Sequence, residues 1–162
     1  MHTWRTGLAL LAAATFTLSA CAPTVRLQAA PEANAVACAN MMVRMPETIG
    51  QLERRSVDAQ ATAAYGTPTA VIVRCGLPQP GPSTLPCATV DGVDWLIDDS
   101  DDPTYVFTSY GLDPATEVVV DSEMVSGTEV LQELAGPVSS QSAPNARCIG
   151  AEDVFSDSPR QG

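Results

Sequence analysis

The chain has 162 residues, with nineteen acidic residues against eight arginines, no lysine, and a formal net charge of −11. This length is enough for one domain with a buried core. This excess of acidic residues argues against binding to nucleic acid, which requires clustered cations. It also predicts a fold that stays away from an anionic lipid surface.

The first twenty residues have the features of an export signal. Arg5 makes a weakly positive start, and Leu8–Leu18 is an apolar run too short to span a hydrocarbon core of about 30 Å. The segment 18–21, Leu-Ser-Ala-Cys, is similar to the bacterial lipobox, whose cysteine receives a diacylglyceryl group before cleavage. Two acyl chains suffice for stable anchoring. We therefore predict a signal peptide over 1–20 and a protein lipid-anchored at Cys21 in the outer leaflet of the cell membrane, on its extracytoplasmic face.

The rest of the chain divides into three parts by composition. Residues 21–33 are small, polar and proline-bearing, which predicts a flexible tether. Residues 34–150 hold the apolar patterning of a single domain, and residues 151–162 form a polar tail that we expect to be disordered.

Four cysteines remain after Cys21, and an even number in an exported domain predicts two disulfides. They are Cys38, Cys75, Cys87 and Cys148. Three pairings are possible. We favour Cys75–Cys87, which would staple the proline-rich loop between them, and Cys38–Cys148, which would tie the two ends of the domain.

The apolar patterns predict a helix, several strands and a second helix. Asn34 is the expected cap of a first helix through Met45, and Pro46 ends it. Ser126 and Glu129 fit a capping box for the second helix, which Gly136-Pro137 stops or kinks. The expected strands are 54–57, 69–75, 93–98, 105–110 and 117–121. Short connections between them predict an α+β fold: an antiparallel meander sheet of four to five strands, with both helices packed on one face.

Several of these segments resemble an actinobacterial lipoprotein family catalogued as domain of unknown function 3515. The more specific pieces are Arg74-Cys75-Gly76 and Val93-Asp94-Trp95. Further matching pieces are Cys38 with Met45-Pro46, the segments 64–68, 71–73 and 90–92, and Tyr110-Gly111, whereas Tyr65 stands where the family more often has Trp. The resemblance implies a place in the cell envelope and carries no assigned activity, cofactor or catalytic residue.

The residue types exclude most catalytic chemistry. The only histidine is His2, inside the signal, so the exported domain has neither an imidazole nor a lysine amine for triads, Ser-Lys dyads or Schiff bases. We predict no cofactor and no metal, although methionines near Met41 would suit copper and the acidic run 98–102 would suit calcium. Paired carboxylates remain for a glycosidase, with candidates at Asp94, Asp98, Asp99, Asp101 and Asp102.

Arg74, Trp95, Tyr105 and Tyr110, with Phe107, form a candidate ligand patch, against the alternative that the aromatic side chains are core. The sequence thus predicts a non-enzymatic binding or structural module of the cell envelope, whose partner is an envelope protein or a small ligand. The alternative function is a carboxylate-dependent hydrolase of envelope glycans.

Overall fold

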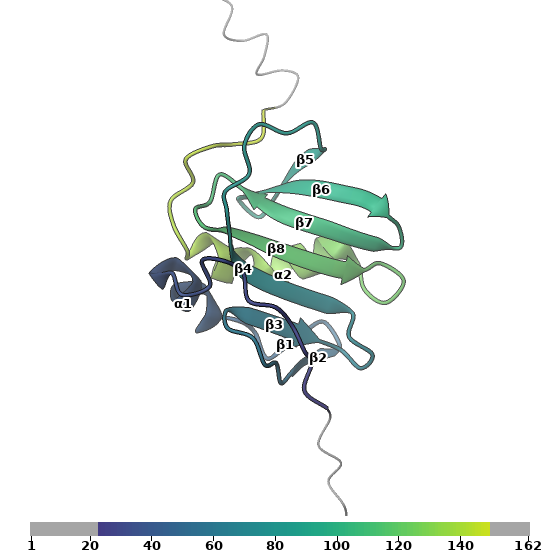
Figure 1. Ribbon diagram of the computed structural model, residues 1–162. Helices are drawn as coiled ribbons and strands as arrows, with labels where there is room; N and C mark the ends of the chain where they lie inside the picture. The colour runs from purple at the N-terminus through teal and green to yellow at the C-terminus, as the bar shows by residue number, and fades with distance from the viewer. Residues whose placement is uncertain (1–22, 150–162) are drawn as a thin grey trace, which may run out of the picture.

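The computed structural model describes residues 23–149, which form one antiparallel sheet and two helices, as the α+β prediction requires (Figure 1). The elements are α1 (Val36–Met42), β1 (Thr48–Ile49), β2 (Leu52–Arg55), β3 (Thr62–Tyr65), β4 (Val71–Leu77), β5 (Cys87–Val90), β6 (Val93–Asp101), β7 (Thr104–Tyr110), β8 (Ala115–Asp121) and α2 (Gly127–Ser139).

The sheet has eight strands in the order β1-β2-β3-β4-β8-β7-β6-β5, not the four to five expected. Two antiparallel meanders of four strands each, β1–β4 and β5–β8, meet where β4 pairs with β8. The chain leaves β4 at the centre of the sheet, and the proline-rich loop carries it to the far edge, where β5 begins.

The strands that the prediction missed have weak local signals. β3 reads Thr-Ala-Ala-Tyr, and alanine has low strand propensity, yet all four residues are buried between β2 and β4. β5 is joined to β6 by Asp91-Gly92, both with positive φ, which is the two-residue hairpin that an Asp-Gly pair favours. That dipeptide was a usable signal for β5.

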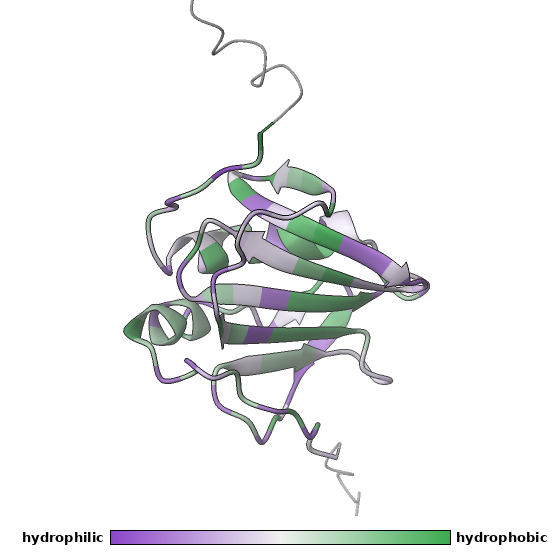
Figure 2. Cartoon of the chain, turned by 45° about the horizontal axis from the view of Figure 1, so that its top comes forward, coloured by the Kyte–Doolittle hydropathy of each residue, from purple (hydrophilic) through white to green (hydrophobic). Residues whose placement is uncertain are grey.

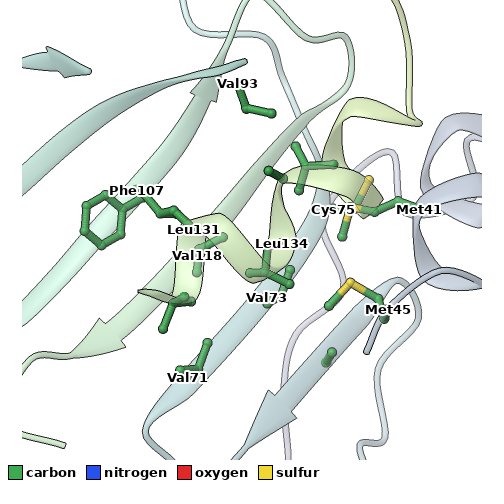
Figure 3. Packing of buried hydrophobic residues seen from close by; sticks show 14 of the residues in the cluster. Met41, Met45, Val71, Val73, Cys75, Val93, Phe107, Val118, Leu131 and Leu134 are labelled. Carbon is green, nitrogen blue, oxygen red and sulfur yellow. The ribbon is translucent and has the colours of Figure 1, made fainter. Parts of the chain in front are cut away.

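One face of the sheet and helix α2 enclose the core. Val71 and Val73 of β4 alternate with half-buried Ile72 and Arg74, and the strands show the same banding of hydrophobic and hydrophilic residues in Figure 2. Leu131 and Leu134 of α2 pack on this face, beside Val118 and Phe107 (Figure 3). Helix α1 lies at the ends of the strands, and its Met41 joins the same core.

Both helices differ from their predicted boundaries. α1 follows Ala35 rather than an Asn34 cap and ends at Met42, although Met45 is still buried. α2 does begin after Ser126, but within residues 23–149 the Ser126 side chain makes no capping hydrogen bond. Gly136-Pro137 does not stop this helix, which continues to Ser139; burial of Pro137 and Val138 offsets the missing backbone donor.

The segment from Pro23 to Ala33, expected as a flexible tether, packs against the domain instead. Val25 forms a parallel bridge with Val57, and the Leu27 N–H donates to an Asp58 carboxylate oxygen at 2.9 Å. Ala33 is buried against Gly76, where a β-carbon would lie 2.5 Å from the Ala33 nitrogen. The segment crosses the face opposite α2 (Figure 1). The ordered domain therefore begins at least ten residues earlier than the composition indicates.

Two disulfides are present, as predicted, but the favoured pairing is wrong. The bonds are Cys38–Cys75 and Cys87–Cys148, each with Cα atoms 5.6 Å apart. The register aligns Cys87 with Leu96, Thr108, Glu117 and Arg74 across successive strands. Cys87 therefore lies four strand spacings, about 19 Å, from the end of β4 that carries Cys75. This distance is beyond the reach of a disulfide. Cys75 also faces the α2 side with Val73, whereas Cys87 shares the other face with Arg74.

Candidate functional site

The sheet register separates the candidate ligand patch into two faces. Trp95 pairs with Ser109 and Tyr105 with Val120, which puts both aromatic side chains on the α2 side. Arg74 is on the opposite face and donates to a Glu117 carboxylate oxygen at 2.8 Å. The four predicted residues therefore cannot form one site.

Tyr110 is also on the opposite face, because it pairs with Asp94, the neighbour of Trp95. It lines a separate small cavity of about 170 Å³ together with Asp94, Ser142 and Arg147. The chain after α2 closes this cavity: the Asn145 N–H donates to the Gly111 carbonyl at 2.8 Å. The C-terminal end of the domain therefore forms one wall of this cavity.

The aromatic residues on the α2 side line a pocket of about 290 Å³ under the first turn of α2. Its apolar walls come from four strands and the helix, and they include Val90, Trp95, Ile97, Tyr105, Phe107 and Leu131. Hydroxyl groups of Ser122, Ser126 and Thr128 lie at the helix end of the pocket. We call this space the aromatic pocket.

Local packing explains why the space stays open. A β-carbon on Gly127 would lie 2.8 Å from Cζ of Phe107, so glycine lets the helix begin directly over that ring. The Tyr105 and Phe107 rings stack with centroids 6.2 Å apart. Strands β5 and β6 extend beyond the helix on this side, which leaves Val90 and Ile97 half-buried.

Trp95 forms part of the pocket wall, and its side chain is fully buried. The indole N–H has no hydrogen-bond partner among residues 23–149. Buried polar groups are normally satisfied, so this N–H is an exception; because its nitrogen has no accessible surface, we assign it no contact with a ligand.

The pocket suits binding rather than acid-base catalysis. None of the described residues that line it is charged, and the polar side-chain groups it offers are hydroxyls. Pockets with apolar walls and a few polar groups are typical small-molecule sites, and this one is at the small end of that range.

The carboxylates proposed for a glycosidase do not surround Trp95. Asp94 accepts hydrogen bonds from the Thr89 hydroxyl at 2.6 Å and the Cys148 N–H at 2.8 Å, on the face opposite Trp95. Asp98 is four residues further along β6, about 13 Å away, whereas paired glycosidase carboxylates lie about 5–9.5 Å apart.

Asp98 also lacks the electrostatics of a general acid. Hydrogen bonds from Ser100 lower the pKa of its exposed carboxyl, whereas a catalytic acid needs a raised pKa. The neighbours Asp99, Asp101 and Asp102 are exposed at the end of the β6–β7 hairpin. Within the described range no three His, Cys, Asp or Glu side chains group as metal ligands, and the Met41 sulfur is buried in the core, 3.4 Å from the Thr116 hydroxyl oxygen.

Comparison with known proteins agrees with the sequence resemblance. The chain matches the family described as "Protein of unknown function (DUF3515)" over residues 5–146. It belongs to this family. No curated protein and no solved structure matches the chain.

The DUF3515 match includes most of the predicted signal as well as the domain. Cys21, the predicted lipidation site, lies outside the described residues. Over residues 23–149 no helix is long and apolar enough to cross a bilayer.

Proposed function

We propose that this DUF3515 protein is an actinobacterial lipoprotein, anchored by Cys21 to the extracytoplasmic face of the cell membrane, that binds a small apolar ligand in the aromatic pocket. The segment 18–21 supports the anchor, because it combines a lipobox-like sequence with a preceding apolar run. The two disulfides support an oxidising compartment, because such bonds are rare in the cytosol.

The single observation that supports ligand binding is the aromatic pocket. The pocket is open to solvent and leaves apolar side chains exposed in a hollow of about 290 Å³, an arrangement that is typical of ligand-binding grooves. Gly127 and the small residue Ala88 border this space.

The surroundings of the pocket favour an uncharged ligand. Residues 78–125, which include the second meander, contain ten acidic residues and no arginine, so their field repels anions. The pocket wall offers no carboxylate to pair with a cation. An apolar group with a hydrogen-bonding end near Ser126 and Thr128 fits both conditions.

Fluorescence can test this directly, because the only tryptophans are Trp4, in the predicted signal, and Trp95, in the pocket wall. The exported domain, residues 22–162, is titrated with the neutral probe N-phenylnaphthylamine and with the anionic probe anilinonaphthalene sulfonate. We expect the neutral probe to bind more tightly, with energy transfer from Trp95.

A matched pair of variants on β5 locates the probe. Ala88→Phe puts a ring on the pocket side, so we expect binding to weaken by about tenfold, or about 1.4 kcal/mol. Thr89→Phe adds the same ring on the opposite face and should leave binding unchanged. Equal binding by wild type and Ala88→Phe, or tighter binding of the anionic probe, would contradict the proposal.

The anchor is tested separately on the intact protein. Mass spectrometry of protein extracted from membranes should show a chain that begins at Cys21 and carries a diacylglyceryl group. Cys21→Ala should lose that mass and leave the membrane fraction. An unmodified wild-type Cys21 would refute the anchor without affecting the ligand pocket.

A further inference from the structure

Hydrogen bonds fix the chain to the domain from Pro23, the first residue that the structure describes. The Arg55 guanidinium donates to the Pro23 carbonyl at 2.8 Å, and the Val25 N–H donates to the Ser56 carbonyl at 2.8 Å. Arg55 also donates to the Gly66 carbonyl and the Thr67 hydroxyl, at 2.7 and 2.8 Å. We call the surface around these contacts the anchor face; it consists of Pro23–Arg26, Arg54–Ser56 and Gly66–Thr67 at the β2 edge, with the Arg54 side chain on the α2 side of that edge and Arg55 on the other side.

Covalent geometry places Cys21 close to this surface. Consecutive Cα atoms are 3.8 Å apart, so the Cα of Cys21 lies within about 7.6 Å of the Cα of Pro23. A flexible tether of thirteen residues would instead allow a root-mean-square span of about 20 Å. The ordered segment after Pro23 removes that freedom.

Charge is divided between the two meanders. Residues 23–77, which include β1–β4, contain five arginines and four acidic residues, whereas residues 78–125 contain ten acidic residues and no arginine. The sheet order keeps these halves apart in space. An anionic bilayer therefore repels the β5–β8 half and not the half that bears the anchor face.

The anchor face also offers cationic groups beside the chain start. Arg26 is exposed, and Arg54 is half-buried with its guanidinium 4.0 Å from the Glu47 carboxylate. Arg54 and Arg55 line a shallow hollow of about 520 Å³ that continues to Thr67 and also includes the exposed acidic residue Glu53. Guanidinium groups pair well with phosphate.

Resting on the proposed lipid anchor, we propose that the anchor face lies against the phospholipid headgroups, with Arg26 and Arg54 beside lipid phosphates. In this orientation the β1–β2 edge of the sheet is the part nearest the bilayer. The aromatic pocket, on β5–β8, lies three to six strand spacings away, about 14–29 Å from β2, and faces the envelope rather than the bilayer.

The test uses the full acylated protein in vesicles of equal parts phosphatidylglycerol and phosphatidylcholine, with a nitroxide on some of the phosphatidylcholine headgroups. A tryptophan is introduced at the anchor face by Thr67→Trp or, as a matched control, in the loop before β5 by Thr84→Trp. Both threonines are exposed, and buried Trp95 gives the same background in both variants. We expect the nitroxide to remove more than half of the emission added at position 67 and little at position 84.

A second variant tests the short connection itself. A Gly/Ser linker of about twelve residues inserted between Ala22 and Pro23 would span about 19 Å. It should reduce quenching at position 67 while the protein remains bound to the vesicles.

The outcomes separate the two proposals. Equal quenching at 67 and 84 in acylated, vesicle-bound protein would overturn the orientation and leave the lipid anchor intact. Protein that carries no acyl group and does not sediment with vesicles would overturn both. Quenching at 67 that the linker does not reduce would support the contact of Arg26 and Arg54 with the headgroups and contradict the part assigned to the short connection.

Discussion

Removing each disulfide in turn should destabilise the domain unequally. Cys38–Cys75 and Cys87–Cys148 close loops with sequence separations of 37 and 61 residues. The chain-entropy relation gives about 4 kcal/mol for either loop, so loop length alone predicts similar costs.

Burial creates the difference. Cys38 and Cys75 are fully buried, whereas Cys87 is exposed on the edge strand. The Cys75 sulfur also accepts a hydrogen bond from the Gln141 side-chain amide at 3.0 Å. Cysteine-to-alanine substitution removes two buried sulfur atoms, and the space they leave adds roughly 1–2 kcal/mol of cavity cost. We expect about 5–6 kcal/mol for Cys38→Ala with Cys75→Ala, and about 4 kcal/mol for the other pair.

Urea unfolding of the exported domain, followed by Trp95 emission, measures both costs. Domains of this size have stabilities of about 5–15 kcal/mol, so loss of the buried bond should leave the fold marginal. Peptide mapping without reduction should find Cys38 linked to Cys75. A larger cost for the Cys87–Cys148 pair, or a Cys75–Cys87 peptide, would refute this reasoning.

Three further predictions concern single residues of the core. Burial raises the pKa of Tyr65 to about 12, above about 10 in the unfolded chain, so the unfolded state loses its proton first. Stability should therefore fall by about 2 kcal/mol as pH rises from 10 to 12, and Tyr65→Phe should remove that fall in alkaline unfolding curves. Gly76→Ala should destabilise by at least 1–3 kcal/mol in urea, because φ is +107° and the methyl meets the Ala33 backbone; an unchanged midpoint would contradict this. Thr116→Val should cost about 1–3 kcal/mol by thermal unfolding, because the buried Gln141 oxygen loses a donor at 2.8 Å, and a neutral result would show that water replaces it.

The overall charge does not describe how charge is distributed over the domain. A net charge of −11 predicts a domain that stands off anionic lipid, yet five of the six arginines in residues 23–149 precede Leu77. The fold collects these residues in one half because β1–β4 are neighbours in the sheet. Net charge averages over a surface, whereas the interaction of a protein with a bilayer depends on the side that faces it.

The sequence by itself determined the α+β class, the presence of two disulfides and the cores of several elements. Strong local patterns carried these predictions: alternating β-branched residues at Val71–Val73, and the helical spacing of Val130, Leu131 and Leu134. The family resemblance also came from local segments, and the match over residues 5–146 confirms it.

Only the tertiary structure decided the strand order, the cysteine pairing and the division of the candidate patch. Trp95 and Tyr110 fall on opposite faces because the register pairs Tyr110 with Asp94, and Cys75 misses Cys87 because β8, β7 and β6 lie between them. These relations depend on which strands are neighbours. Distant pairing is set by packing of the whole sheet, so no local run of residues encodes it.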